Sequence, residues 1–392
     1  MTSNIAHHTI TVVEYSDPIE HFKGWLVIDG GEHSLCAGGM RVQQNLTCEH
    51  VMAMAKNMTM KMRICGLPID GAKCGIDYHP DAPGKLQAMT RFMAAIKPYI
   101  EDRYSMGPDL NTSMDELESI ARELNIPSVK MAIAKAQGIT LRAFLDRYEI
   151  LSHKAIGDWP LGRLRAGFGV AMAALAALDF MSIPPQGARI AIQGFGNLAK
   201  AAIVALTDAG AIITAIGDAK KCVLGHNHQP LPVHLYLDEQ GTLLPEITSN
   251  DSVKIEPKET ITTCECDLLI LAAIEGVITR TNADQIKAKV VIPGANLAIT
   301  PDGEEALFAR RIIALPSFVA GCGGSLSMNG LFGPAEKPQT RQVLDYIASA
   351  MTQMVDKILN KSHSNAINPT KAAEMLCRDT LAPPRLKPYS LG

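Results

Sequence analysis

The sequence predicts a two-domain α/β protein. Its 392 residues exceed what one small hydrophobic core can hold. Apolar segments of strand length alternate with segments of helical periodicity in both halves of the chain. Pro184, Pro185 and Gly187 break the chain between a helical segment and the strands of the second half, so we expect a separate unit to follow.

The overall composition excludes several classes of protein. Apolar residues make up 47% of the chain, the net charge is -3 and the sequence pI is about 6.4, so we expect no nucleic acid and no membrane among the partners. We find no apolar run long enough to span a membrane and no signal-peptide pattern, which predicts a cytoplasmic protein. The nine cysteines include no Cys-x-x-Cys pair, so neither a disulfide framework nor a metal site is expected.

The first domain is expected over residues 1–145. Residues 24–29 predict a strand, and residues 49–64 and 85–100 carry apolar side chains at helical spacing. This mixture of strand and helices predicts an α/β domain.

The second domain is expected over residues 146–330. Its first helix is Ala-rich, and a strand, a helix and a further strand follow it as one βαβ unit. Three later apolar runs extend the parallel sheet, as is typical of a Rossmann-like doubly wound fold. The ranges are 161–181, 188–193, 197–208 and 211–216, then 268–273, 290–293 and 312–316. A helical pattern at 341–360 belongs to C-terminal helices over 331–392, which we expect to return to the first domain.

A glycine turn joins the first strand of the βαβ unit to its helix. It reads Gly194-Phe195-Gly196-Asn197-Leu198-Ala199. The first glycine permits the tight turn, the second lets backbone approach a pyrophosphate, and the alanine allows close helix packing. Free N–H groups at the helix N-terminus face the phosphate charge. The turn therefore predicts a nicotinamide dinucleotide site.

Asp218 stands at the end of the second strand of the unit. There a carboxylate accepts hydrogen bonds from the adenine-ribose diol and repels a 2′-phosphate, so NAD is favoured over NADP. Two plainer alternatives stay open: a glycine turn that only connects strand to helix, and Asp218 as an ordinary surface residue.

Three short motifs with basic residues lie close together in the first domain. They read Gly38-Gly39-Met40-Arg41, Met58-Thr59-Met60-Lys61 and Gly71-Ala72-Lys73-Cys74-Gly75. Lys61 ends an apolar-faced helix, and Lys73 is expected in a glycine-rich loop that leaves room for a ligand. Two partly buried ammonium groups in one cleft disfavour each other's charge, so one of them can act as a neutral base. The alternative is a pair of solvated surface lysines.

These motifs and several others occur in the order typical of the glutamate/leucine/phenylalanine/valine dehydrogenases, which the chain resembles over residues 24–330. The further motifs are Pro68-Ile69-Asp70-Gly71-Ala72-Lys73, Pro108-Asp109-Leu110-Asn111-Thr112, Ala272-Ala273, Gly294-Ala295-Asn296 and Gly323-Gly324. The chain resembles the leucine and phenylalanine type more than the glutamate type. The resemblance implies reversible NAD-dependent oxidative deamination of an L-amino acid, and a homo-oligomer formed through the first domain.

The resemblance also implies a role for each site residue. Lys73 and Asp109 would be catalytic: Lys73 activates the water that attacks the imine, and Asp109 carries protons to and from the departing amine. Lys61 would hold the substrate α-carboxylate. The other implied substrate-binding positions are Ala37, Gly39, Met40, Gly107, Ser325 and Met328. The implied cofactor-binding positions beyond the turn and Asp218 are Ala272, Ala273 and Asn296.

Several positions depart from the family pattern. Asp70 and Cys74 replace glycines around Lys73, and Asp70 is expected to set a carboxylate beside its amine. Pro293 replaces an acidic residue, Gly321 replaces an asparagine, and the threonine of the family's Ala-Thr-Gly segment is missing. These changes indicate an unusual substrate.

Ala37 stands where glutamate enzymes of the family carry a lysine that pairs with the side-chain carboxylate of the substrate. Burying a second carboxylate without that cation is costly, so glutamate is disfavoured. Gly107 leaves space that suits a bulky apolar or aromatic side chain, whereas Ser325 keeps a polar side chain open. The alternative is that these positions only pack.

Two other functions remain as alternatives. A 2-hydroxy-acid dehydrogenase on a similar nucleotide domain would need a histidine with a carboxylate partner and an arginine, and the sequence offers no comparable motif. A catalytically silent NAD-binding regulatory homologue is suggested by the changes around Lys73 and by the missing threonine expected at the nicotinamide.

Overall fold

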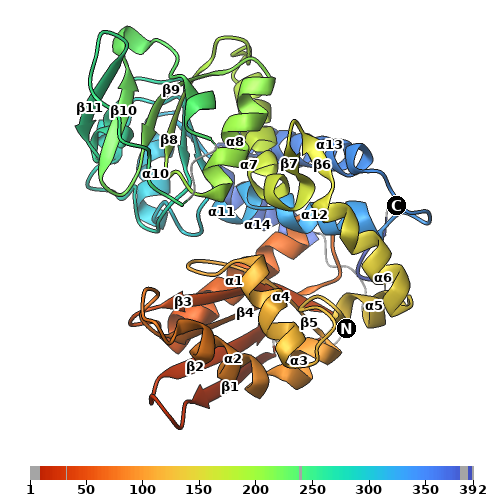
Figure 1. Cartoon of the computed structure of the whole chain (residues 1–392). Coiled ribbons are helices and arrows are strands. Elements are labelled where there is room, and N and C mark those ends of the chain that lie inside the picture. The colour runs from red at the N-terminus through yellow and green to blue at the C-terminus, as the bar shows by residue number, and fades with distance from the viewer. Residues whose placement is uncertain (1–8, 32, 238–240, 380–386, 391–392) are drawn as a thin grey trace. The chain divides into compact units, whose positions relative to one another are not determined.

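The structure, a computed structural model, describes residues 9–31, 33–237, 241–379 and 387–390 (Figure 1). The chain forms two compact units, Met1–Tyr148 with Cys377–Gly392, and Glu149–Leu376. The expected boundary after residue 145 falls inside helix α6 (Leu141–Tyr148), the last helix of the first unit before the chain leaves it.

The first unit is built on a five-stranded sheet in the order β1-β2-β4-β3-β5. Strands β4, β3 and β5 run parallel, so their carboxyl ends meet at one edge, whereas β2 is antiparallel to both of its neighbours. The strands are β1 (Ile10–Ser16), β2 (Lys23–Asp29), β3 (Cys36–Gln43), β4 (Asp70–Asp77) and β5 (Tyr104–Pro108). The helices are α1 (Cys48–Ile64), α2 (Lys85–Ala95), α3 (Lys97–Asp102), α4 (Met114–Glu123), α5 (Ala132–Gln137) and α6.

The two faces of this sheet have different coverings. Alternate side chains such as Met40 and Cys74 enter a core that includes Phe92 of α2. On the opposite face, α1 packs over β2 and β4, and Met54 contacts the cluster around Trp25. The odd-numbered residues of β3 and β4 therefore share the face on which α1 lies.

Lys73 lies in the middle of strand β4 and not in the expected glycine-rich loop. The neighbouring glycine has a packing role, since a Cβ on Gly71 would lie 2.2 Å from the backbone nitrogen of Thr59 in α1. The glycines around Lys73 thus permit close approach of a helix to a strand.

The helical pattern expected over 85–100 forms two helices, α2 and α3. The break falls at Ile96, and Pro98 stands in the first turn of α3. Proline suits a first helical turn and disfavours a continuous helix through it, which explains the division.

The second unit is built on a seven-stranded sheet in the order β11-β10-β9-β8-β12-β13-β14. The βαβ unit is confirmed, and β9, β8, β12, β13 and β14 run parallel. Two strands that the sequence did not predict, β10 and β11, extend this sheet and are antiparallel to their neighbours, and β10 begins three residues after Asp218. A short connection of this kind suits an antiparallel return and not a parallel crossover.

The strands of this unit are β6 (Lys154–Ile156), β7 (Trp159–Pro160), β8 (Arg189–Gln193), β9 (Ile212–Gly217), β10 (Lys221–Gly225), β11 (Val253–Pro257), β12 (Leu268–Leu271), β13 (Val290–Pro293) and β14 (Ile313–Ala314). The helices are α7 (Leu161–Phe180), α8 (Asn197–Asp208), α9 (Thr260–Thr263), α10 (Pro301–Ala309), α11 (Ser317–Ala320), α12 (Gly323–Phe332), α13 (Thr340–Asn365) and α14 (Pro369–Asp379). The last helix, α14, carries the chain from the second unit back to the first.

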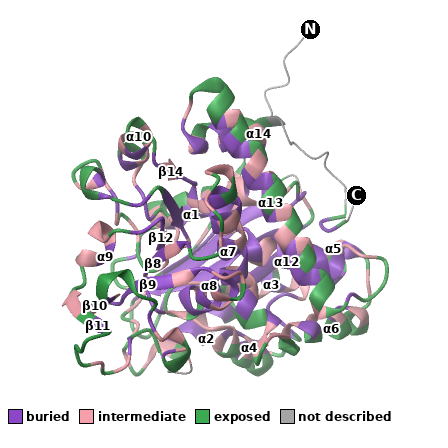
Figure 2. Ribbon diagram, turned by 90° about the horizontal axis from the view of Figure 1, so that it is seen from above, coloured by how far each residue is buried: buried purple, intermediate pink, exposed green. Residues whose placement is uncertain are grey.

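Helix α7 is the central helix of the second unit. It is long and apolar enough to pass as a membrane span by composition, which corrects the expectation that no such run exists, but 67% of its apolar window is buried. A Cβ on Gly167 would lie 2.3 Å from the carbonyl oxygen of Leu198 in α8, and one on Gly169 would lie 2.4 Å from the Cα of Gly323 in α12. Figure 2 shows α7 largely in the buried colour, so its apolar surface serves the core of the unit.

The C-terminal helices return to the first unit later than expected. Helix α13 buries Val343, Ile347 and Met351 and packs on α7 and α12, so it belongs to the second unit. The return begins at Cys377, and Tyr389 exchanges two hydrogen bonds with Gln137, of 2.8 and 3.1 Å. The apolar face of α13 explains why it stays with the helices of the second unit.

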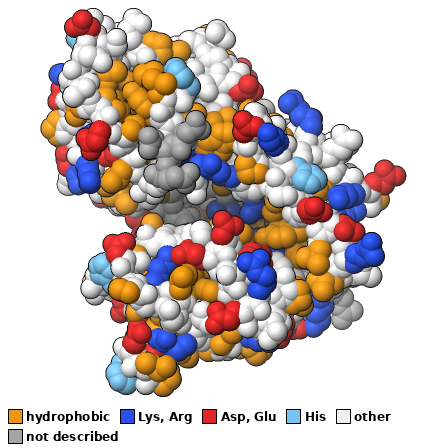
Figure 3. Space-filling model, viewed as in Figure 1, with side chains coloured by type: hydrophobic (Ala, Val, Ile, Leu, Met, Phe, Trp, Pro, Cys, Tyr) orange, Lys and Arg blue, Asp and Glu red, His pale blue; other side chains and the backbone are white. Residues whose placement is uncertain are grey.

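The surface carries charges of both signs. On the face drawn in Figure 3, Lys and Arg side chains are interspersed with Asp and Glu side chains. This mixture agrees with the net charge of -3, and on that face it gives no broad field of one sign.

Gly38→Ala tests the packing of the site strands. A Cβ at Gly38 would lie 1.6 Å from the carbonyl oxygen of Ala72, so the variant must push β3 and β4 apart. We expect a loss of about 3 kcal/mol in the free energy of unfolding, measured by urea titration of the purified protein. Gly107→Ala is the matched control, because its Cβ would lie 3.6 Å from the nearest atom, and it should cost less than about 1 kcal/mol. Equal unfolding midpoints for the two variants would contradict the close approach.

Candidate active site

A buried carboxylate between two cations forms the centre of the first unit. The Nζ atom of Lys73 lies 3.0 Å from Oδ1 of Asp109, and Nε of Arg41 lies 2.6 Å from Oδ2. The side chains of Lys73 and Arg41 are only 3% and 5% exposed. Each oxygen of the carboxylate therefore has its own cation, and we call these three residues the charged trio.

Strand register explains why the charged trio meets. Gly39 of β3 pairs with Gly107 of β5, and Arg41 pairs with Gly75 of β4. Alternation along each strand places these residues and Lys73 on one face, and Asp109 follows Gly107 by two positions. A Cβ on Gly39 would lie 3.0 Å from the Cβ of Asp109, so glycine at this position lets Asp109 approach β3 closely.

The loop that carries Asp109 is tied to β3. The backbone N–H of Asp109 donates to Oγ1 of Thr112 at 2.9 Å, and that hydroxyl donates to the carbonyl oxygen of Met40 at 2.8 Å. Asn111 adopts φ of +61°, a conformation that asparagine tolerates, and its Nδ2 donates to the carbonyl of Val42 at 2.9 Å. These bonds fix the position of the Asp109 carboxylate.

The charges around Asp109 decide its ionisation. Burial favours the neutral acid, but the nearby Lys73 and Arg41 and their hydrogen bonds outweigh burial and lower the pKa of Asp109 to about 2. Asp109 is therefore an anion at neutral pH. Asp109 can take up a proton during a reaction only when Lys73 or Arg41 is displaced from its carboxylate.

Arg41 is a site residue that the sequence reasoning did not select. It belongs to the Gly38-Gly39-Met40-Arg41 motif, but no role was predicted for it. Its position two residues after Gly39, on the face of Lys73, is the signal that identifies it once the strands are aligned.

Three residues predicted near the reaction point away from it. Asp70 pairs with Nη2 of Arg103 at 2.9 Å, so its carboxylate does not lie beside the amine of Lys73 as expected. Cys74 accepts a hydrogen bond from the hydroxyl of Tyr104 at 3.4 Å, and burial raises the pKa of its thiol to about 12. Met40, predicted to bind substrate, buries its side chain in the core beside Cys74. All three occupy even-numbered strand positions, which face away from the charged trio.

Two other predicted substrate positions lie on elements next to the charged trio. Lys61 is half-buried in the last turn of α1, the helix that packs against β4. Ala37 of β3 pairs with Gly71 and with Ser105 of β5 and shares the face of Lys73. Their contacts with a substrate stay predictions.

Lys130 is a buried lysine that the sequence reasoning missed. Lys130 is only 6% exposed. Its Nζ atom lies 3.6 Å from the position that a Cβ would have at Gly107. It stands outside every motif, in the segment between α4 and α5. Burial of a lysine is rare enough to single it out, but burial is visible only in the structure.

The glycine turn of the second unit has the expected form. Gly194 adopts φ of +106°, and a Cβ there would lie 2.9 Å from the carbonyl group of Ala272 and 3.1 Å from the Cβ of Ala273. The backbone N–H of Ala272 donates to the carbonyl of Gln193 at 2.7 Å. The structure thus brings Ala272 and Ala273, both predicted near the cofactor, against the turn.

Gly196 opens helix α8 and leaves room for a ligand. A Cβ at Gly196 would meet Thr242 at 3.7 Å and nothing closer among the described residues. No described side chain caps the helix, and Asn197 is exposed at its first position. An open approach to uncapped N–H groups fits the pyrophosphate of a dinucleotide.

The two apolar residues of the turn serve packing. Phe195 is buried, and Nζ of Lys200 lies 4.5 Å from the centre of its ring. A Cβ on Gly294 would lie 2.8 Å from Leu198, which ties the turn helix to the segment after β13. Phe195 and Leu198 therefore hold the turn, and any cofactor contact falls to their backbone.

Asp218 binds backbone in the structure. Its Oδ1 accepts from the N–H groups of Lys220 and Lys221 at 2.7 and 2.8 Å, and Oδ2 accepts from that of Leu244 at 2.7 Å. Asp218 thus organises the β9–β10 turn and anchors the later segment, a role that the sequence reasoning did not foresee. Its contact with a ribose stays a prediction.

Asn296 and the predicted pocket residues of α12 complete the second unit. Asn296 is half-buried after β13, and the preceding Ala295 donates to the carbonyl of Leu271 at 2.8 Å. This places Asn296 near the carboxyl ends of β12 and β13, the edge where doubly wound sheets bind ligands. Met328 is buried and Ser325 half-buried on α12, and their substrate contacts stay predictions.

The described part of the chain holds no disulfide and no metal-binding cluster. All nine cysteines are free thiols. Within residues 9–31, 33–237, 241–379 and 387–390, no group of three or more His, Cys, Asp or Glu side chains is arranged to hold a metal ion. The charged trio and the glycine turn remain the features that carry chemistry in each unit.

The chain matches two family descriptions. Residues 3–126 match "Glu/Leu/Phe/Val dehydrogenase, dimerisation domain", and residues 162–382 match "Glutamate/Leucine/Phenylalanine/Valine dehydrogenase". The first range contains the charged trio and the second contains the glycine turn.

Several curated proteins are similar over most of the chain. Glutamate dehydrogenase of Thermotoga maritima is 29% identical over 316 residues, 78% of this chain and 71% of the relative. NADP-specific glutamate dehydrogenase A1 of Halobacterium salinarum is 28% identical over 325 residues, 81% and 73% of the two chains. NAD-specific glutamate dehydrogenase of Clostridioides difficile is 28% identical over 331 residues, 80% and 74%. These three relatives are named glutamate dehydrogenases, so they do not support the expected likeness to the leucine and phenylalanine type.

Solved structures confirm the two-domain α/β fold. The hetero-hexameric glutamate dehydrogenase from Thermus thermophilus has a TM-score of 0.72 at 20% identity, covering 95% of this chain and 87% of that one. The L-tryptophan dehydrogenase from Nostoc punctiforme has a TM-score of 0.59 at 16% identity, covering 94% and 95%. At these identities the likeness concerns the fold.

Asp109→Asn tests the electrostatics of the trio. A carboxyl group whose pKa is lower in the folded state stabilises the fold above its unfolded pKa, and this contribution is lost as the pH falls toward the folded value of about 2. We expect the variant to lose about 2 kcal/mol in the free energy of unfolding at neutral pH. The difference in the free energy of unfolding between the native protein and the variant should stay constant from about pH 7 to 5. It should become smaller below about pH 4, as measured by urea unfolding.

Asp102→Asn is the control for this series. Asp102 forms an ion pair with Lys135 at the surface and is 58% exposed, so its removal should change stability by less than about 1 kcal/mol at any pH. If the difference in unfolding free energy between the native protein and Asp109→Asn became larger on acidification, Asp109 would not be ionised in the folded protein.

Proposed function

Because the chain belongs to the glutamate/leucine/phenylalanine/valine dehydrogenase family, we propose that it catalyses the reversible, NAD-dependent oxidative deamination of an L-amino acid to a 2-oxo acid and ammonia. The observation that carries the proposal is the buried ion pair of Lys73 and Asp109, at 3.0 Å, which Gly39 allows by its lack of a side chain. An amine and a carboxylate at this distance can exchange a proton directly.

The residues of the first unit have separate tasks in this reaction. Lys61 binds the α-carboxylate of the substrate. Lys73 orients a water molecule toward the substrate Cα and takes a proton from it, and Asp109 passes protons between Lys73 and the substrate nitrogen. Arg41 positions Asp109 through the 2.6 Å contact and keeps it ionised until the substrate amine arrives. With the loss of one hydride to the nicotinamide dinucleotide, the amino acid and one water molecule become a 2-oxo acid, ammonium and one proton.

The residues of the second unit suit a nicotinamide dinucleotide. Gly194, Gly196 and the first turn of α8 would hold the pyrophosphate, with Ala272, Ala273 and Asn296 nearer the nicotinamide. When bound, the nicotinamide accepts a hydride from the substrate Cα. The open approach at Gly196 supports this assignment.

NAD is proposed over NADP because of Asp218. Its carboxylate accepts three backbone hydrogen bonds, and a carboxylate offers about four lone-pair sites, so it can still accept from a ribose hydroxyl. Its negative charge repels a 2′-phosphate. The curated relatives include NAD-specific and NADP-specific enzymes, so the choice depends on this residue.

We further propose a cytoplasmic homo-oligomer that uses small-molecule substrates. The first unit matches a dimerisation domain, and the Thermus thermophilus relative is described as hexameric. The free thiols suit a reducing compartment.

The proposed side chain of the substrate is apolar or aromatic and is not that of glutamate. Gly107 adds no bulk of its own, and a Cβ there would make only ordinary contact, at 3.6 Å, with Nζ of Lys130. Ala37 supplies no cation for a second carboxylate. The curated relatives are named glutamate dehydrogenases, so the panel of amino acids includes glutamate as well as apolar and aromatic members.

The proposal of a silent homologue loses one of its two supports. The side chains of Asp70 and Cys74 turn away from Lys73 toward Arg103 and Tyr104. The missing threonine of the Ala-Thr-Gly segment is the other support, and it is unaffected. The charged trio keeps an amine, a carboxylate and a guanidinium in contact.

Lys73→Ala tests the mechanism. The native protein should form NADH with at least one member of a panel of L-amino acids and consume it with ammonium and the 2-oxo acid. We expect Lys73→Ala to lower kcat by about 1000-fold or more and leave NAD affinity unchanged, measured by NADH absorbance and by fluorescence titration.

Lys23→Ala is the matched control, because Lys23 lies on β2 and its side chain is 56% exposed. Retained activity of Lys73→Ala would contradict the proposed role of the amine. A native protein that binds NAD and turns over no member of the panel in either direction would contradict the proposed function.

Asp218→Asn tests the choice of cofactor. Removing the negative charge should lower the ratio of kcat/KM for NAD to that for NADP by about tenfold, since one unit charge is removed from the position facing the 2′-phosphate. Asp208→Asn, an exposed carboxylate at the end of α8, should leave the ratio unchanged. A native protein that prefers NADP would refute the assignment.

A further inference from the structure

The long connection between β10 and β11 returns to the glycine turn at residues 241–245, which we call the strap. A Cβ on Gly196 of the turn would lie 3.7 Å from Cγ2 of Thr242. The backbone N–H of Leu244 donates to Oδ2 of Asp218 at 2.7 Å. The strap therefore lies against two of the positions that the proposed function assigns to the cofactor.

Hydrogen bonds hold both ends of the strap. At its start, the carbonyl oxygen of Gly241 accepts from Nζ of Lys200 in α8 at 3.0 Å. At its end, the carbonyl oxygen of Pro245 accepts from Nζ of Lys221 in β10 at 2.7 Å. The bond of Leu244 adds a third attachment, at the end of β9. Because α8 begins in the glycine turn, the strap is fixed relative to that turn.

The attachment at Lys200 uses a buried charge. Lys200 is only 1% exposed, which is rare for a lysine. Its ammonium group lies 4.5 Å from the centre of the Phe195 ring, and Phe195 belongs to the glycine turn. The contact with the ring and the charge-assisted bond to Gly241 offset the cost of removing the ammonium group from water. Lys200 thus connects the strap to the turn itself.

The residues between the attachments are exposed. Thr242 is exposed, and Leu243 is 37% exposed. Leu244 is buried and fastens the strap to the body of the unit. A hydroxyl group and an apolar side chain are thereby accessible beside the glycine turn. The hydroxyl can donate to a phosphate oxygen, and the leucine side chain can cover an aromatic base.

The order of the strap residues matches the order of the groups in the ADP half of a dinucleotide. Thr242 lies at Gly196, beside the N-terminus of α8, which is the proposed place of the pyrophosphate. Leu244 is bonded to Asp218, the proposed place of the adenine ribose. Leu243 stands between them, and two residues of extended chain span at most about 7 Å. The strap therefore follows the expected path of the ADP group.

We propose that the strap binds the ADP half of the cofactor, with the hydroxyl of Thr242 donating to the pyrophosphate and the side chain of Leu243 covering the adenosine. The inference rests on the proposed NAD-dependent function and adds a second side to the cofactor site. This side comes from a segment that lies outside every sequence motif described above. Lys200 is a positioning residue, because it acts on the cofactor through the strap.

The experiment compares ligands that contain different parts of the cofactor. The affinities of the whole protein for NADH, ADP-ribose and adenosine are measured by NADH fluorescence and by competition with NADH. Thr242→Val keeps the shape of the side chain without its hydroxyl. It should weaken binding of NADH and ADP-ribose by about tenfold and leave that of adenosine unchanged. Leu243→Ala should weaken binding of all three ligands by about fivefold.

Thr352→Val and Leu235→Ala are the matched controls. Thr352 is exposed on α13, and Leu235 is 63% exposed in the connection between β10 and β11. Each control should leave the three affinities unchanged. Thermal unfolding of each variant shows whether it is folded.

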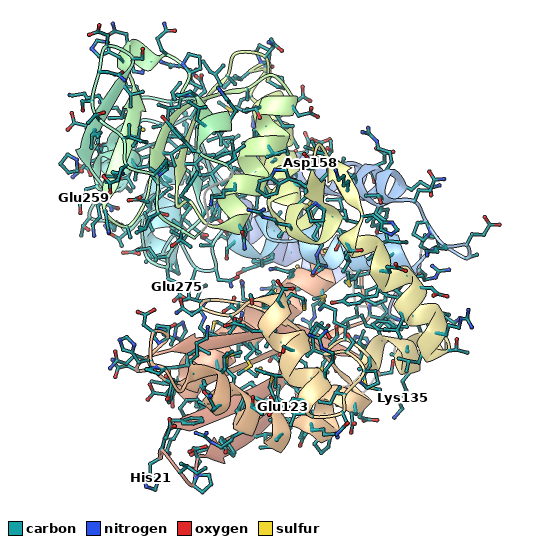
Figure 4. All side chains as sticks on the ribbon, viewed as in Figure 1. His21, Glu123, Lys135, Asp158, Glu259 and Glu275 are labelled. Atoms are coloured by element: carbon teal, nitrogen blue, oxygen red, sulfur yellow. The ribbon has the colours of Figure 1, made fainter. Side chains whose placement is uncertain are left out.

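Lys200→Met tests the attachment of the strap. It should weaken ADP-ribose binding by about tenfold, and the double variant with Thr242→Val should lose less than the product of the two single losses, because a released strap no longer brings the hydroxyl to the pyrophosphate. The full product would contradict a positioning role. Lys154→Met is the control, because Lys154 is 73% exposed and its partner Asp158 lies at the surface (Figure 4). Lys221→Met replaces Lys200→Met if that variant is not folded.

The possible results separate the strap from the proposed function. Unchanged affinities of Thr242→Val and Leu243→Ala would overturn the inference, and so would tighter binding, since the strap would then obstruct the site. An equal loss for adenosine and ADP-ribose in Thr242→Val would contradict the contact with the pyrophosphate. A native protein that binds NADH no better than both strap variants refutes the inference alone. A native protein that binds neither NADH nor ADP-ribose refutes the proposed function.

Discussion

The constraint on which the first unit depends is a carboxylate held between two buried cations at the ends of parallel strands. Neither Lys73 nor Arg41 could remain in the interior without the charge of Asp109, and Asp109 could not be buried as an anion without them. The geometry requires three strands in one register and a loop tied down by Thr112. The glycines follow from the same demand, because any larger residue at Gly38 or Gly39 would occupy space taken by backbone or by Asp109.

Local chemistry made part of this architecture predictable. The βαβ unit and its glycine turn depend on short-range periodicity and on the conformation of Gly194, and both can be read from the sequence. Lys73 and Asp109 were found because they belong to short motifs. Lys73 was expected in a loop but lies in strand β4. The nearby glycines suggested a flexible loop, but Gly71 instead allows α1 to pack closely on the strand.

What escaped prediction depends on contacts between distant segments. The position of Arg41 beside Asp109 appears when β3 is aligned with β4 and β5, and the burial of Lys130 appears when its segment is paired with Met106. Asp218 was located correctly, but the donors that surround it, including Leu244, come from a later part of the chain. Helix α13 was found, yet its assignment to a unit required knowledge of its packing on α7. In each case the sequence shows the type of the residue but does not show which distant residue it contacts.

The close approach at Gly39 has a consequence for how a change of sequence can reach the charged trio. A Cβ there would lie 2.9 Å from the carbonyl oxygen of Pro108 and 3.0 Å from the Cβ of Asp109. A substitution at Gly39 would therefore displace the carboxylate without altering any charged residue. The charge balance of the buried trio thus depends on a position that carries no charge of its own.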